Sequence, residues 1–203
     1  MKTMLARALI RWVTMLGLGL WLGGILFLGA VSAPAIFRFC RAHGVEPLAP
    51  QLVGALVARF GPLTVTLGVV LCVAWAFDGL FSHCGRTAQE RAPARLLWRV
   101  QGVCLLAMLS LTLYLNFAAL PELLREQGAV IRESVATGTS LNATTGGAKS
   151  AARLRFDALH QRYSQLTMVV FYLGVTALAV LSWRLSNAEH LNAELGMRNA
   201  EKS

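Results

Sequence analysis

Long apolar segments alternate along the chain with short clusters of charge. Four segments contain no charged residue, and they are 26, 18, 22 and 21 residues long. A helix rises about 1.5 Å per residue and the hydrocarbon layer is roughly 30 Å thick, so about 20 residues span it. Inside lipid a segment has to satisfy its own backbone amides, which a helix does. The pattern therefore predicts four transmembrane helices, at about 12–37, 60–81, 100–121 and 163–184.

The segment after the third span has a different pattern. Apolar residues recur there at helical spacing, from Leu123 to Val135, with charged residues between them. This is typical of an amphipathic helix that lies on the membrane surface or on the end of a bundle. Residues 134–150 are small and polar without a period, which indicates a flexible linker. A helix is expected to resume near Ala151 and to continue through span four.

These elements define one expected domain and a tail. The fold class is all-α: an integral membrane four-helix bundle with an amphipathic interfacial helix between spans three and four. The bundle covers residues 1–186, and residues 187–203 form a polar C-terminal tail. Four spans place both ends of the chain on the same side of the membrane, which we call the terminal side.

Glycine and proline mark expected contacts and bends. Gly19 and Gly23 form a small-xxx-small pair, which either lets another helix approach closely or reflects the general frequency of glycine in membrane helices. Pro34 should kink or loosen the end of span one. Pro62 suits a first helical turn, so span two is expected to start there, and span three is expected to end at Pro121.

Composition narrows the class of partner. Hydrophobic residues make up 56% of the chain and charged residues 14%, well below the quarter or so of a soluble domain. The net charge of +9 would raise the question of nucleic acid in a soluble protein. Here the basic residues flank the spans, where lipid phosphates and topology explain them, and no nucleic-acid recognition pattern is present. The expected partners are the lipid bilayer and either other membrane-protein subunits or a second copy.

The basic residues also predict an orientation. Ten Lys and Arg residues lie outside the spans on the terminal side and nine, more dispersed, on the other side. Dense basic residues close to span ends count most, which favours both termini in the cytoplasm. The basic start and first apolar run resemble a secretory signal. The run is longer than a signal core, and Pro34 follows the cleavage-like residues, so we interpret it as a retained span.

Polar and helix-breaking residues gather at the end of the spans away from the termini, which we call the non-terminal end. A site, if one exists, is expected to open there. The alternative is that span ends are always more polar than span centres. The candidate site residues at this end are His160, Asn116, Arg38, Ser164 and Ser32.

His160 is the candidate with the most specific chemistry. It shares a helical face with Phe156 and Tyr163, just before span four. It is either a haem or metal ligand, with copper the metal considered, or a proton-handling group, or a helix-end histidine bonded to a loop or a lipid headgroup. Met168 lies about 12 Å further along the helix, too far to share an ion with it.

Asp78 lies at the edge of span two. It is either a coupling residue in transport or an interfacial carboxylate paired with an arginine. The candidate partners are Arg11, Arg86 and Arg99.

The four cysteines show no disulfide, zinc or iron–sulfur spacing. Cys40 and Cys84 lie on opposite sides of the membrane. Cys72 and Cys104 are expected to pack as small apolar residues. No nucleophile elbow, phosphate loop or paired carboxylates appear, so the motifs indicate neither an enzyme nor a resident cofactor.

Four motifs form a distinctive combination: Trp21-Leu22-Gly23-Gly24, Ala33-Pro34-Ala35-Ile36-Phe37, Tyr114-Leu115-Asn116 with Pro121, and residues 155–164. Together they resemble a bacterial family known as domain of unknown function 4149, which is related to eukaryotic transmembrane protein 205. The motif at 155–164 is similar to the family's Phe-x-x-Leu-His-x-x-Ser signature, although Tyr163 stands where the serine is expected and Ser164 follows.

The resemblance covers most of residues 10–183. It implies a four-span bundle in the bacterial inner membrane, without a settled activity. The link of the eukaryotic relative to platinum-drug resistance implies transport or metal handling. A more distant likeness to copper-resistance and haem-pathway membrane proteins supports haem or copper at His160.

Three hypotheses about function follow. The first is a non-catalytic accessory or assembly component that supports a larger assembly or membrane homeostasis through its helix faces and the 122–160 segment. The second is a haem- or copper-binding redox or transfer protein that uses His160, with His43 as a second ligand. The third is a small-solute or metal transporter. The first is favoured because the spans lack the buried ionisable network that transporters usually need.

Overall fold

The computed structural model describes residues 2–45, 48–82, 88–137 and 150–200 of the chain. Every regular element in these residues is a helix, which confirms the prediction of an all-α fold. Two of the elements, η1 and η3, are π-helical turns. The elements are α1 (Lys2–Leu26), η1 (Phe27–Ser32), α2 (Ala33–Ala42), α3 (Ala49–Ser82), α4 (Ala88–Tyr114), η3 (Leu115–Ala119), α5 (Leu120–Thr137) and α6 (Ala151–Ala200).

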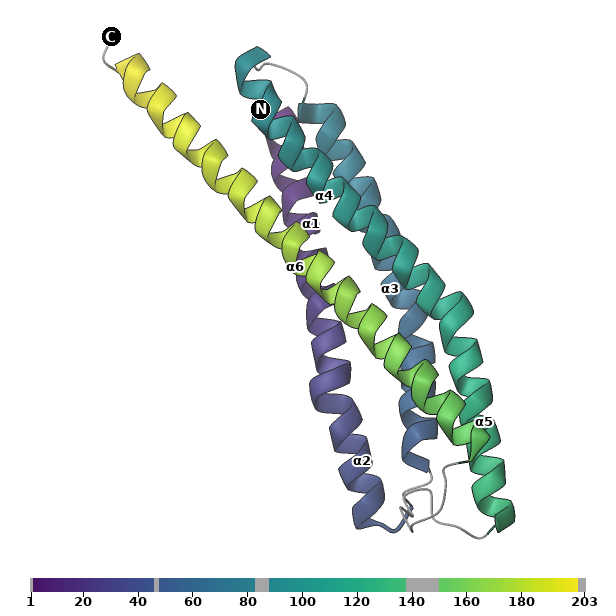
Figure 1. The fold of residues 1–203 in the computed structure, drawn as a ribbon. Coiled ribbons are helices and arrows are strands. Elements are labelled where there is room, and N and C mark those ends of the chain that lie inside the picture. The colour runs from purple at the N-terminus through teal and green to yellow at the C-terminus, as the bar shows by residue number, and fades with distance from the viewer. Residues whose placement is uncertain (1, 46–47, 83–87, 138–149, 201–203) are drawn as a thin grey trace.

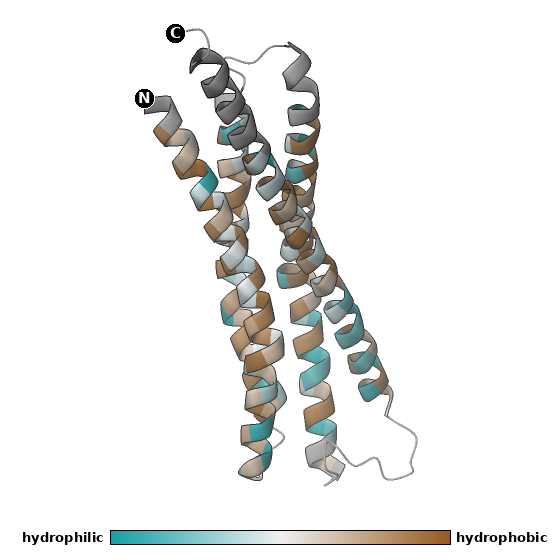
Figure 2. Ribbon diagram, turned by 90° about the vertical axis from the view of Figure 1, so that its left-hand side faces the viewer, coloured by the Kyte–Doolittle hydropathy of each residue, from teal (hydrophilic) through white to brown (hydrophobic). Residues whose placement is uncertain are grey.

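Four stretches of these helices are long and apolar enough to cross a membrane. They are Ala8–Ala42, Ala49–Leu80, Arg95–Glu133 and Ala151–Ser186. Their large apolar side chains face outward: Leu20, Val103 and Phe117 are 67%, 67% and 73% exposed. Such a surface is unfavourable in water by about 25 cal/mol per Å² of apolar area, whereas lipid accepts it. The chain is therefore an integral membrane protein, with its apolar residues along the middle of the rods (Figure 2).

The spanning helices pack in a closed ring. α1 packs on α3, α3 on α4, α4 on α6, and α6 on α1. Figure 1 shows that α6 crosses the other helices obliquely and that both termini lie at the same end of the bundle. The predicted four-helix bundle is thus confirmed.

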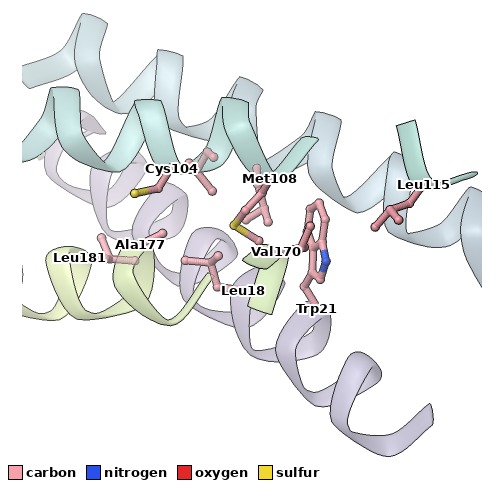
Figure 3. Close-up of a cluster of buried hydrophobic side chains, with 10 residues drawn as sticks. Leu18, Trp21, Cys104, Met108, Leu115, Val170, Ala177 and Leu181 are labelled. Carbon is pink, nitrogen blue, oxygen red and sulfur yellow. The ribbon is translucent and has the colours of Figure 1, made fainter. Parts of the chain in front are cut away.

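The bundle core lies where the four spanning helices meet. Leu18 and Trp21 of α1 belong to one buried cluster with Leu71 of α3, Met108 of α4 and Ala177 of α6, and all five are almost fully buried (Figure 3). The indole of Trp21 packs directly on the backbone of α3 at Gly68, where an added Cβ would lie 2.7 Å from the ring. A glycine in the neighbouring helix therefore makes room for the largest core side chain.

Gly19 and Gly23 make no close contact within the chain. Both face outward, and a Cβ at either position would meet no atom within 4 Å. The close approaches in α1 are made instead by Gly17, which faces Leu71, and by Gly24, which faces the ring of Phe60. The small-xxx-small pair thus does not mark a helix contact inside this bundle.

Each π-helical turn comes just before a proline. η1 ends at Ser32, ahead of Pro34, and η3 ends at Ala119, ahead of Pro121. A proline lacks the N–H that an α-helix needs, and its ring crowds the carbonyl four residues back; a wider turn relieves both problems. The loosening expected at Pro34 is confirmed. The helix does not end at Pro121, because η3 lets the chain continue directly into α5.

Two further expected boundaries are wrong. α3 begins at Ala49, not near Pro62, and Pro62 lies inside the helix. Prolines are tolerated within membrane helices because neighbouring groups satisfy the freed backbone, so Pro62 was misleading as a start signal. α5 extends to Thr137, so the start of the expected 134–150 linker is helical, and residues 138–149 lie outside the described residues.

The amphipathic helix α5 is present between spans three and four. It continues the line of α4 and packs on the first half of α6, so it forms part of the non-terminal end of the bundle (Figure 1). α6 runs on through most of the polar tail, as far as Ala200.

Candidate functional site

A cavity of about 480 Å³ lies at the non-terminal end, enclosed by α2, α3, α5 and α6. Small-molecule sites usually have volumes of roughly 300–1,000 Å³. We call this cavity the end pocket. It is lined by Phe37, Arg41, Ala49, Pro50, Val53, Gly54, Val57, Leu120, Leu123, Leu124, Gln127, Val130, Ile131, Arg153, Phe156, His160 and Tyr163.

The apolar face of α5 forms one wall of the pocket. Its residues from Leu120 to Ile131 recur every three or four positions, so they lie on one side of the helix and face α3 and α6. Gly54 of α3 lets this wall approach, since a Cβ there would lie 2.8 Å from Leu124. The apolar face of α5 is therefore turned into the bundle, where it lines the end pocket.

Polar groups of the pocket come from three helices. Arg41 lies in the last turn of α2, Gln127 in the middle of α5, and Arg153 in the first turn of α6, followed by His160 and Tyr163. None of the lining residues carries a carboxylate. The pocket is therefore apolar in its walls and basic in its polar groups.

Gln127 is the unusual member of this set. Its side chain is only 8% exposed, and its amide Nε2 has no hydrogen-bond partner among the described residues. An unpaired buried donor of this kind destabilises a fold by about 1–3 kcal/mol, and buried polar groups in native proteins are nearly always paired. The amide is therefore suited to a ligand that brings an acceptor oxygen into the pocket.

His160 is the predicted site residue that lines the pocket. Its ring stacks on that of Phe156 at 5.8 Å between centroids, as their shared helical face indicated. Ser164 lies one turn further along α6, is exposed and does not line the pocket. The side chains of His83 and His190 are outside the described residues, and His43 bonds through Nδ1 to the carbonyl of Phe39.

The other three predicted residues have local roles. Arg38 is exposed and its Nε donates to the carbonyl of Pro34, while Ser32 lies half-buried in η1. Asn116 donates from Nδ2 to the carbonyl of Thr112 at 2.8 Å and packs closely against Gly61 of α3. The structure therefore does not bring the five predicted residues together.

Sequence reasoning missed Arg41, Gln127 and Arg153. Gln127 had a signal, because it is a polar residue at a position of α5 where the helical period expects an apolar one. The two arginines had none, since arginines at the ends of spans are ordinary.

A second polar cluster lies toward the terminal end. Asp78 is 5% exposed and its Oδ2 lies 2.6 Å from Nη2 of Arg184. Arg184 also donates through Nη1 to Oε1 of Gln101, and Nε of Arg11 lies 4.0 Å from Oδ1 of Asp78. The four residues belong to α3, α6, α4 and α1, so this cluster, which we call the Asp78 cluster, joins all four spanning helices.

The Asp78 cluster confirms one expectation and corrects another. Arg11, one of the predicted partners of Asp78, does pair with it, but among the described residues Arg184 lies closer, although it is 106 positions away in the chain. The inference that the spans lack a buried ionisable network is wrong. The residues of this network lie on four separate helices, one on each. Their proximity depends on how the helices pack, and the sequence does not give that packing.

The cysteines and histidines do not assemble into a metal centre. Within the described part of the chain, no group of three or more His, Cys, Asp or Glu residues is placed to hold a metal ion. Cys104 is buried in the core and Cys72 packs against it, in agreement with their expected role. Cys84 lies outside the described residues.

A family model described as "Domain of unknown function (DUF4149)" matches residues 16–128, more than half of the chain. The match includes α2, α3 and the first half of α5, and so three of the four helices around the end pocket. It ends before α6, which supplies Arg153 and His160. No curated protein and no solved structure matches the chain.

Proposed function

The chain belongs to the DUF4149 family, and we propose that it is a non-catalytic accessory protein of the membrane that holds an apolar or amphipathic molecule in its end pocket. The end pocket carries this proposal. It combines apolar walls, a volume suited to a small molecule and a buried amide that lacks a partner.

The position of the pocket supports an accessory role. α2 packs on α3, α5 packs on α6, and α3 has only a small contact with α5. A bound molecule contacts both pairs of helices and so sets their spacing at this end of the bundle. A membrane-protein partner that binds the outer faces of the same helices then contacts a surface that differs between the ligand-bound and the ligand-free protein.

The proposal includes a location. The bacterial inner membrane, with both termini in the cytoplasm, is supported by the density of Lys and Arg near span ends on the terminal side. The end pocket then opens toward the periplasmic side of the bilayer.

Native mass spectrometry of the protein extracted from membranes in mild detergent tests the pocket. We expect a stoichiometric co-purified molecule that is lost in Val53→Trp, because Val53 lines the pocket and the indole fills it. Leu52→Trp is the matched control, since Leu52 is the residue of α3 directly before Val53 and is 50% exposed. If no molecule is retained, or both variants retain it equally, the proposal is wrong.

Haem or copper binding at His160 is a second candidate. The support for it is that His160, although exposed, contributes to the lining of a largely apolar pocket. The expected result is a Soret band, or one copper per chain, in the purified protein and its loss in His160→Ala. Protein that carries neither after expression with added haem and copper excludes this candidate.

A further inference from the structure

The chemistry of the end pocket defines the class of its ligand. We infer that the pocket binds an anionic lipid, with an acyl chain against the apolar walls and the acidic headgroup at Arg41, Arg153 and His160. This inference rests on the proposed function and makes it more specific.

The charged residues of the pocket lining are all basic. Arg41 and Arg153 reach the same cavity from α2 and α6, His160 lies two turns beyond Arg153, and the lining contains neither Asp nor Glu. Asp157 pairs with Arg153 at 3.9 Å but does not line the cavity. Two arginines in the lining of one cavity, Arg41 exposed at its edge and Arg153 half-buried, suit the oxygens of a phosphate or carboxylate, which arginine binds by paired hydrogen bonds.

The amide of Gln127 is an independent observation. Its Nε2 is buried in the lining, and no group in the part of the chain that the structure describes forms a hydrogen bond with it. A donor in that position requires an acceptor, and the ester and phosphate oxygens of a lipid headgroup are acceptors only. The donor of Gln127 and the charges of the arginines therefore select the same kind of group.

The walls exclude a small free anion as the preferred ligand. Phe37, Val53, Val57 and Phe156 surround the cavity, and a hydrated anion would leave these side chains in contact with water. An acyl chain removes that water. A zwitterionic lipid fits the walls equally well and carries the same phosphate, but its ammonium group adds a positive charge beside that phosphate, which Arg41 and Arg153 repel.

The inferred route into the pocket is lateral, from the bilayer. At this end α3 lies between α2 and α5 and contacts both, as Figure 1 shows. Among the described residues, α2 and α6 do not pack on each other as α2 and α3 do. A lipid chain can therefore enter from the side, between α2 and α6.

Delipidated protein in mild detergent is titrated by native mass spectrometry with three probes. They are dioleoyl phosphatidylglycerol, dioleoyl phosphatidylcholine and glycerol phosphate. The first bound phosphatidylglycerol is expected to have at least tenfold higher affinity than phosphatidylcholine, and glycerol phosphate is expected not to bind in the same range. Arg41→Gln with Arg153→Gln should remove this preference.

The matched control is Arg38→Gln with Arg155→Gln. Arg38 and Arg155 lie on the same two helices, are exposed and do not line the pocket, so their removal changes the net charge equally. The control should keep the tenfold preference. If it loses the preference as the pocket variant does, general surface charge explains the binding and the inference is wrong.

Gln127→Leu gives a test that does not depend on charge. It removes a buried donor without a partner, so the lipid-free variant should unfold at the same or a higher temperature than the wild type. Its affinity for phosphatidylglycerol should nevertheless fall severalfold. A variant with unchanged affinity contradicts the role assigned to Gln127.

The outcomes separate this inference from the proposed function. If phosphatidylcholine binds as tightly as phosphatidylglycerol and Val53→Trp abolishes both, the pocket function stands and the anionic preference is wrong. If neither lipid binds at a defined stoichiometry, both proposals are wrong. Binding of glycerol phosphate at the affinity of phosphatidylglycerol shows a free-anion site and overturns the inference.

Discussion

At the scale of single residues, Asp78 holds the terminal end of the bundle together. Its carboxylate is buried between the guanidinium groups of Arg184 and Arg11. Oε1 of Gln101 accepts a further hydrogen bond from Arg184. A buried charge is tolerated when it is paired and hydrogen-bonded, and removal of one partner leaves the other uncompensated. We therefore interpret the cluster as a connection between the four helices, whereas a transporter would use it as a titrating group.

Asp78→Asn tests that interpretation. The variant should lower the free energy of unfolding by about 3–5 kcal/mol, because Arg184 then stays buried without a counter-charge. Unfolding in increasing sodium dodecyl sulfate, followed by circular dichroism, measures the change. Glu122→Gln is the control, since Glu122 is exposed at the start of α5, and its stability should match that of the wild type.

A second substitution distinguishes a structural pair from a transport residue. Asp78→Asn combined with Arg184→Gln should recover part of the lost stability, because the uncompensated charge is removed together with its partner. Normal stability of Asp78→Asn, together with loss of proteoliposome uptake of a solute, contradicts the structural role and supports transport.

At the scale of elements, glycine and proline decide how the helices pack and continue. A π-helical turn precedes Pro34 and another precedes Pro121, and the helix continues through both prolines. Glycines that face a neighbouring helix admit a large side chain, as Gly68 admits Trp21, whereas Gly19 and Gly23 face outward. The same residue type therefore has opposite consequences on the two faces of a helix.

Gly68→Ala should destabilise the bundle. The added Cβ would lie 2.7 Å from the ring of Trp21 and 2.9 Å from Leu109, and Trp21 is almost fully buried, so the ring has little room to move. Overpacking of this kind costs about 1–3 kcal/mol. The difference should appear in the same detergent unfolding experiment.

Gly19→Ala is the matched control in α1. A Cβ there meets no atom within 4 Å, so the monomer should keep or slightly raise its stability. Equal destabilisation of the two variants would show that glycine acts through backbone flexibility and not through helix contact.

At the scale of the whole molecule, one end of the bundle holds the termini and the Asp78 cluster, and the other end holds the pocket. Several hydrophilic residues lie at the pocket end in Figure 2, and apolar residues cover the middle of the rods. The Asp78 cluster ties the helices together near one end, while the pocket leaves a space between them at the other. This difference predicts that ligand binding changes the spacing of the helices at the pocket end.

The topology is testable with protease-sensitive tags. A tag inserted after Gly44, in the exposed turn between α2 and α3, should be cut in right-side-out spheroplasts, whereas tags at the N- and C-termini should be cut in inside-out vesicles. The reverse pattern contradicts the cytoplasmic location of the termini. Tags at the two termini on opposite sides of the membrane contradict the four-span bundle itself.

The sequence alone determined that this chain is four apolar helices. Each span is a local property: between Arg99 and Glu122, for example, no charge interrupts 22 residues, and that length spans lipid. The amphipathic period of α5 and the shared face of Phe156 and His160 are also local. Helix ends were less predictable, because in lipid the chain passes through Pro62 and Pro121 where in water proline usually marks a boundary.

Only the tertiary structure decided which polar residues meet. Arg184 pairs with Asp78 across 106 positions, and the pocket draws Arg41, Gln127 and Arg153 from three helices. In a soluble protein, apolar periodicity shows which face of a helix is buried. In a membrane nearly every face of a helix is apolar, so the pattern does not distinguish a face that contacts lipid from one that contacts a neighbouring helix. The rotation of each helix is set by close packing at residues such as Trp21 and Gly68, and that packing brings the charges and the buried amide together.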